Sequence, residues 1–115
     1  MTHNDKTIPF PNLARFWAVR PRLQNFAARL HALGDPQQPA RAVETALAAE
    51  LIRETRRTTS RDGFGRALPL LDPATPRTRA ALLEKLAEAE TALGAFEALY
   101  YRADNGDAPR WRLDP

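Results

Sequence analysis

Apolar residues recur every three or four positions through the first third of the chain, which is the spacing of one face of a helix. Asn12 can cap the start of such a helix, and Gly34 can end it. The pattern therefore predicts a first helix over residues 12–33. The apolar positions of its repeating face are Phe16, Val19, Leu23, Phe26, Leu30 and Leu33.

Pro21 lies inside this repeat. A proline within a helix removes one backbone hydrogen bond and clashes with the preceding turn, at about 3 kcal/mol. Two arrangements fit the sequence: one helix kinked at Pro21, or two helices that meet near Arg20. The unbroken phase of the repeat favours the kinked helix.

A second helix is predicted from Pro39, which fits a first helical turn, to about Arg57. Threonine and serine at positions 58–60 have lower helix propensity and favour an end there. The apolar positions of this helix are Val43, Leu47 and Leu51, with Ala42, Ala46 and Ala49 beside them.

The third helix has the clearest pattern. Thr75 can serve as its N-cap and Pro76 fits its first turn, while Asn105-Gly106 is a signal for its end. We expect the helix to run to about Arg102. Its apolar positions are Leu82, Leu86, Ala89, Leu93, Phe96 and Tyr100.

Three amphipathic helices in a chain of 115 residues predict one all-α domain, a small antiparallel three-helix bundle. Residues 1–11 are expected to form an extended lead-in, which Ile8 and Phe10 pin to the core. Residues 58–75 read as a long, irregular, basic loop between the second and third helices, and residues 104–115 as an irregular tail.

The composition narrows the class of protein. The chain has no cysteine, which excludes disulfides, thiolate metal ligands and cysteine nucleophiles. The first ten residues have no basic stretch followed by an apolar run, and no window approaches the roughly 18 apolar residues of a membrane span. We therefore expect a cytoplasmic protein without a membrane association.

Catalytic equipment is sparse. The two histidines, His3 and His31, have no evident partner, and the sequence has no HxxxH or ExxH pair at helical spacing for a metal. Ser60 is not in a GxSxG nucleophile elbow. The clustered carboxylates lie mostly opposite the apolar stripe of the third helix, as on a solvated face: Glu84, Glu88 and Glu90. We expect no enzymatic activity, no cofactor, no metal and no small-molecule substrate.

Positive charge is concentrated in one segment. From residue 53 to residue 79 seven arginines stand against three acids, a net charge of +4, whereas the whole chain carries +3. Guanidinium groups on a helix end and its loop can neutralise phosphates, so contact with nucleic acid, as in a ribonucleoprotein subunit, is the alternative function. The candidate contacts are Arg53, Arg56, Arg57, Arg61, Arg66, Arg77 and Arg79.

Two glycines flank Phe64 within residues 62–66 of the same segment. Their backbone amides could face a phosphate, but the spacing and the lysine of a P-loop are missing. A tight turn with Phe64 packed as a plug is the interpretation that we prefer.

Large aromatic residues fall at the ends of the predicted stripes or beyond them, where side chains are often left for partners. Trp111 lies in the tail between two arginines, and it can dock either on another protein or on the first helix. The sequence thus predicts a non-enzymatic adaptor, accessory subunit or regulator, with self-association as one form of binding. The candidate partner-binding aromatics are Trp17, Tyr100, Tyr101 and Trp111.

Overall fold

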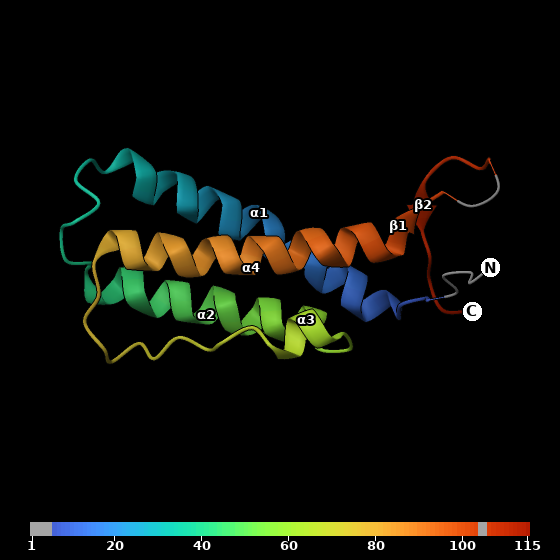
Figure 1. The fold of residues 1–115 in the computed structure, drawn as a ribbon, viewed down its shortest axis with the longest axis horizontal. Helices are drawn as coiled ribbons and strands as arrows, with labels where there is room; N and C mark the ends of the chain where they lie inside the picture. The colour runs from blue at the N-terminus through green and yellow to red at the C-terminus, as the bar shows by residue number, and fades with distance from the viewer. Residues whose placement is uncertain (1–5, 104–105) are drawn as a thin grey trace.

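The computed structural model describes residues 6–103 and 106–115, so His3 and Asn105 lie outside the described residues. Three long helices pack against one another in pairs and form a helical bundle (Figure 1). The elements are α1 (Phe10–Ala32), α2 (Ala42–Thr59), α3 (Gly63–Arg66), α4 (Arg79–Tyr100), β1 (Tyr101–Arg102) and β2 (Arg110–Trp111).

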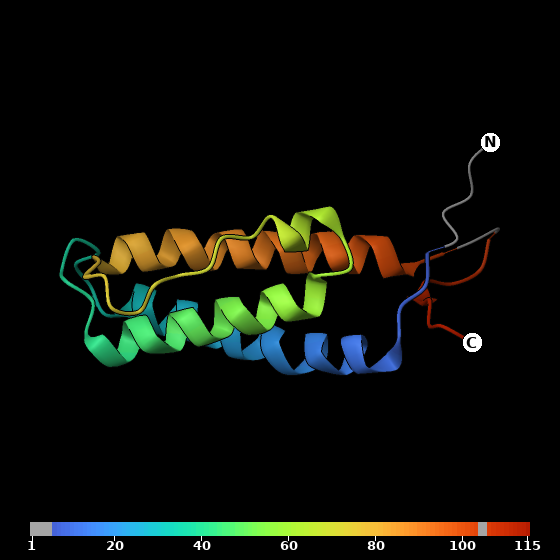
Figure 2. The ribbon, with the colours of Figure 1, turned by 90° about the horizontal axis from the view of Figure 1, so that it is seen from below.

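The long helices do not all alternate in direction. The backbone N–H of Ala40, just before α2, donates to the carbonyl of Arg77, just before α4, so both helices begin at the same end. Figure 1 and Figure 2 together show the segment 67–78 running back along the outside of the bundle, on the side of α2 and α4. Fully extended, this segment reaches about 40 Å, more than the roughly 27 Å length of α2. Helices α2 and α4 are therefore parallel, and the expected antiparallel order holds for α1 alone.

Helix α1 is one continuous helix that passes through Pro21, so the chain is not split there. The bend at Pro21 stays a prediction. The N-cap is Pro9 rather than Asn12, which lies inside the first turn. The side-chain amide of Asn12 instead donates to the carbonyl of Thr58, at 3.3 Å, and joins the start of α1 to the end of α2.

Helix α2 continues to Thr59, beyond the end expected near Arg57. Thr55, Thr58 and Thr59 are fully buried, and each hydroxyl donates to the carbonyl four residues earlier, at 2.8 Å. Such bonds satisfy the buried hydroxyl groups without leaving the helix, so the low propensity of threonine does not end it.

Residues 58–75 were expected to form an irregular loop. The connection after α2 differs from this prediction, because it contains the short helix α3. Helix α3 lies so close to α2 that a Cβ atom on Gly65 would be 1.9 Å from the carbonyl oxygen of Thr59. Farther along, Leu68 and Leu71 are buried and hold the returning segment on the core.

The ends of α4 also differ from expectation. Its N-cap is Thr78 rather than Thr75, and the Thr78 hydroxyl accepts a hydrogen bond from the backbone N–H of Ala81, at 3.1 Å. The helix ends at Tyr100, and the chain continues as β1 instead of running on to Arg102.

Residues 110–114 of the C-terminal tail are held by backbone pairing, which the sequence did not predict. Strand β2 pairs antiparallel with β1, and Tyr101 stands opposite Trp111. The lead-in joins them, because Ile8 is fully buried and its backbone N–H donates to the carbonyl of Arg112, at 3.0 Å. Ile8 therefore pins the lead-in as expected, whereas Phe10 lies in α1 and is 56% exposed.

The core is a single cluster, and most of it comes from the predicted apolar stripes. Leu33 differs from the prediction, because it is exposed. In the second helix Val43 is also exposed, and the core residues are Ala48, Ala49, Leu51 and Ile52. The largest contributions to the core come from α1 and α4. From α1 and α4 it takes Leu13, Phe16, Val19, Leu23, Phe26, Leu30, Leu82, Leu86, Ala89, Leu93, Phe96 and Tyr100.

Candidate interaction surface

Three aromatic side chains from distant parts of the sequence meet at the end of the bundle where α4 finishes. We call Trp17, Tyr101 and Trp111 the aromatic surface. The ring centroids of Trp17 and Trp111 are 6.5 Å apart with perpendicular planes, and those of Tyr101 and Trp111 are 5.2 Å apart. Trp17 is 50% exposed and Tyr101 is 43% exposed, while Trp111 is partly buried between them.

Trp111 is held in place by core residues of α1 and α4. Its ring lies 5.1 Å from the ring of Phe16 and 6.2 Å from that of Phe96, both of which belong to the core. The neighbouring Arg112 anchors the strand, because its backbone N–H donates to the carbonyl of Tyr100 at 2.8 Å. Of the two outcomes left open for Trp111, docking on the first helix is the one observed.

A cavity of about 540 Å³ opens beside these rings. Arg20 closes one edge, where its guanidinium group contacts Glu97 at 2.5 Å and Glu90 at 3.2 Å and lies over the ring of Phe16. The cavity is lined by Phe16, Trp17, Arg20, Pro21, Glu97, Tyr101 and Trp111.

Sequence reasoning missed three lining residues, Arg20, Pro21 and Glu97. A signal for two of them was present, because Trp17, Arg20 and Pro21 stand at positions i, i+3 and i+4 of one helix and so share a face. No local signal places Glu97 there, because its position depends on how α4 packs on α1.

Tyr100 does not belong to the aromatic surface, since its side chain is buried. Its hydroxyl donates to Asp62 at 2.8 Å, and the other carboxylate oxygen of Asp62 contacts Lys6 at 2.9 Å. Burial and the hydrogen bond to the Asp62 carboxylate raise the pKa of Tyr100 to about 12. Tyr100 is a structural link between the lead-in, α4 and the turn before α3.

The arginines of the basic segment do not form one continuous patch of unpaired charge. Arg57 contacts Glu54, Arg61 contacts Asp114, and Arg66 donates to the carbonyls of two residues in the turn after α2. Arg77 is partly buried. In the part of the chain that the structure describes, no ion pair involves Arg53, which is exposed, or Arg56, which is half-buried.

Arg79 is largely buried, with a side chain 11% exposed, and it contacts Glu44 at 3.3 Å. Glu44 also accepts a hydrogen bond from the backbone N–H of Arg41, at 2.8 Å. Burial opposes the charged form, but this hydrogen bond and the Arg79 guanidinium outweigh it and lower the pKa of Glu44 below its ordinary value. The sequence did not reveal this buried carboxylate.

Residues 62–66, which contain Gly63 and Gly65, form a tight helical turn, as the sequence predicted. The backbone N–H groups of Gly65 and Arg66 both donate to the carbonyl of Asp62 and are used inside the turn. Phe64 packs against the core.

The remaining candidates lie on exposed or partly exposed surfaces. Glu84 and Glu88 are exposed, as expected for a solvated face, and His31 is exposed near the end of α1. Over residues 6–103 and 106–115 there is no group of three or more histidine and acidic side chains that could hold a metal ion. Nor is any helix in these ranges long and apolar enough to cross a membrane.

The chain was compared with protein-family models, with curated proteins and with solved structures. No family model, no curated protein and no solved structure matches it.

Proposed function

We propose that this protein is a non-enzymatic interaction module, an adaptor, accessory subunit or regulator, which binds another protein through the aromatic surface. The observation that carries the proposal is the placement of Trp17 and Tyr101. Both rings are about half exposed and both contact Trp111, which is itself packed on the core. Tryptophan and tyrosine are enriched among the residues that dominate binding energy at protein interfaces.

Fixed rings favour binding because little freedom is lost when a partner covers them. Ordering a mobile side chain at an interface costs about 0.5–1.5 kcal/mol, and the contacts of Trp17 and Tyr101 with Trp111 reduce that loss. The adjacent cavity offers a recess for a partner side chain, and the Arg20–Glu97 pair at its edge offers polar contacts.

The test is affinity isolation from the native host with the double variant Trp17→Ala/Tyr101→Ala. We expect it to lose a partner that the wild-type chain retains, because each ring contributes about 2 kcal/mol or more if it is a central contact. Leu70→Ala is the matched control, since Leu70 is an equally exposed apolar residue of the returning segment 67–78. Trp111 is unsuitable as a test because it packs on Phe16 and Phe96.

Thermal unfolding checks that the double variant is folded, and the affinity of the purified partner is then measured for all three chains. A partner bound equally by the double variant would refute the proposal. If nuclease treatment removes the partner from the wild-type chain, the nucleic-acid alternative replaces it, and charge reversal at Arg53 and Arg56 should then reduce binding.

A further inference from the structure

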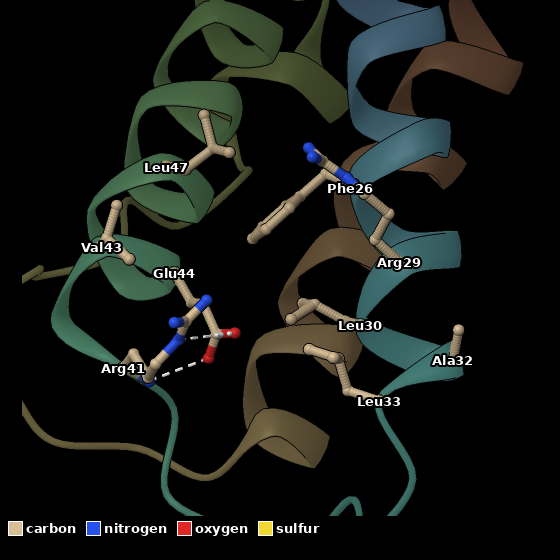
Figure 3. Close-up of a pocket in the computed structure, with 9 residues that line it drawn as sticks. All are labelled: Phe26, Arg29, Leu30, Ala32, Leu33, Arg41, Val43, Glu44 and Leu47. Carbon is tan, nitrogen blue, oxygen red and sulfur yellow. Dashed lines mark hydrogen bonds and ion pairs between the residues drawn. The ribbon is translucent and has the colours of Figure 1, made fainter.

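A second, separate groove runs between α1 and α2. A cavity of about 440 Å³ lies near the end of α1, and a neighbouring cavity of about 730 Å³ shares Arg29 and Leu47 with it. Figure 3 shows the ring of Phe26 and the side chain of Leu30 on α1 facing α2 across the first cavity. The two cavities form one groove along the helix pair, which we call the α1–α2 groove.

The edges of the first cavity are apolar and open to solvent. Val43 on α2 is 64% exposed and Leu33 just after α1 is 49% exposed, and both line the first cavity. The floor between them is formed by Phe26 and Leu30, which are buried core residues. An apolar floor with exposed apolar edges is the form of a groove that receives the apolar face of a helix.

The exposed charge that lines the groove is positive, because the lining acid, Glu44, is buried and paired with Arg79. Arg29 lines both cavities, is exposed, and makes no ion pair within the described ranges. The guanidinium carbon lies over the ring of Phe26, 5.9 Å from its centroid. The other lining arginines, Arg22 and Arg41, each have one acidic neighbour, at 3.7 Å and 3.5 Å. An acidic side chain of a partner would therefore meet an unpaired cation at the middle of the groove.

The length of the groove also fits a helix. Lining residues extend from Arg22 in α1 to Leu33 just after it, which corresponds to about 17 Å, or three helical turns. A second copy of the same groove is a poor occupant, because two copies face to face would bring Arg29 against Arg29. We propose that the α1–α2 groove binds an acidic amphipathic helix of another protein, with its apolar face against Val43 and Leu33 and a carboxylate on Arg29.

This proposal does not rest on the aromatic surface, which lies at the other end of α1, and the experiment keeps the two apart. The probe is a fluorescent synthetic helix of about 18 residues with leucine on one face and glutamate on the other, and its partner probe has lysine in place of glutamate. We expect the acidic probe to bind with micromolar affinity and the basic probe to bind at least about tenfold more weakly.

Two variants locate the binding site. Arg29→Glu and Val43→Asp should each weaken the acidic probe by about tenfold or more, and both residues are exposed enough for the fold to tolerate the change. Arg110→Glu is the matched control, because it reverses an exposed arginine in β2, at the opposite end of the bundle. It should change the affinity by less than about twofold.

Several results would overturn the inference. Equal binding of the two probes, or unchanged binding by Arg29→Glu and Val43→Asp, removes the groove as the site. Loss of the acidic probe in Trp17→Ala/Tyr101→Ala moves the site to the aromatic surface. A dimer in analytical ultracentrifugation that Val43→Asp dissolves identifies a second copy as the occupant. Binding to vesicles of anionic phospholipid, but not to the acidic probe, identifies a membrane surface instead.

Discussion

At the scale of single residues, position 65 has room for a hydrogen atom and nothing larger. An added Cβ would lie 1.9 Å from the carbonyl oxygen of Thr59, which is backbone and cannot rotate away. We therefore expect Gly65→Ala to lower the free energy of unfolding by about 3 kcal/mol, measured by urea denaturation. Gly94, inside α4 with no atom near its added Cβ, is the contrasting position.

Gly94→Ala should raise the free energy of unfolding by about 0.5–1 kcal/mol, because alanine loses less backbone freedom in a helix than glycine does. Similar free energies for the two variants would mean that α3 does not pack on α2 as described. The sequence marked Gly65 as a turn signal, but the contact that requires glycine involves Thr59 and appears only once α3 has folded back.

At the scale of helices, Glu44 joins the start of α2 to the start of α4 through Arg79. Removing one partner of a buried ion pair typically costs about 3–5 kcal/mol. Since the pKa of Glu44 is lowered in the folded chain, its contribution is present above the unfolded pKa and is lost as the pH falls through the folded value. Glu44→Gln should thus lower the midpoint of thermal unfolding at neutral pH, with the difference from wild type shrinking in acid.

Glu50→Gln is the matched control, because Glu50 is a half-exposed glutamate of the same helix that contacts Arg22 at 3.7 Å. It should change the midpoint little at any pH, since exposed ion pairs contribute about 0–1 kcal/mol. A Glu44→Gln effect that stays constant from neutral to acid pH would contradict a role for its charge.

The three long helices were predicted from the apolar repeat alone, because burial follows helical periodicity wherever the chain packs on one side. Their ends were not. Thr75 before Pro76 has the features of a helix start, but the backbone of Arg77 pairs with Ala40 and keeps the chain extended there. The helix begins only after Thr78. The residues next to Thr75 give no signal for the backbone pairing of Arg77 with Ala40, because the two segments are far apart in the sequence.

At the scale of the whole molecule, Tyr100, Asp62 and Lys6 tie the lead-in to the core. Because the folded chain holds the pKa of Tyr100 near 12, against an ordinary value of 10, the unfolded chain loses this proton first as the pH rises. Stability from this group is complete below pH 10 and is lost between 10 and about 12. The full loss corresponds to roughly 3 kcal/mol.

The comparison that isolates this effect is wild type against Tyr100→Phe in urea denaturation over the same pH range. We expect Tyr100→Phe to be about 2 kcal/mol less stable at neutral pH, because it lacks the hydrogen bond to Asp62. The difference should shrink as the pH approaches 12. Tyr101 is present in both proteins, so its titration does not contribute to the difference in stability between them. A difference in stability that stays constant up to pH 12 would rule out a stabilising role for the hydrogen bond between Tyr100 and Asp62.

The candidate site was foreseen in its residues but not in its assembly. Composition and position singled out Trp17, Tyr101 and Trp111, since large rings at the ends of apolar stripes are often exposed. Their meeting depends on the ladder between β1 and β2, which is two residues long on each side and has no periodicity to detect. The apolar repeat of the third helix did place Tyr100, one position earlier, on the core-facing side, but it did not show that the hydroxyl reaches Asp62, which lies 38 positions away in the sequence.

The parallel course of α2 and α4 places like ends of two helix dipoles side by side. Both partly positive N-termini lie where the backbones of Ala40 and Arg77 pair, with Glu44 in the first turn of α2, while Arg56 and Arg57 stand in the last turn of α2. Glu44 therefore complements the dipole of α2 at its start, and the two arginines complement it at its end. The long return of residues 67–78 thus lets the two helix dipoles add, whereas an antiparallel pair would cancel them, and this gives the rod an electrostatic polarity from end to end.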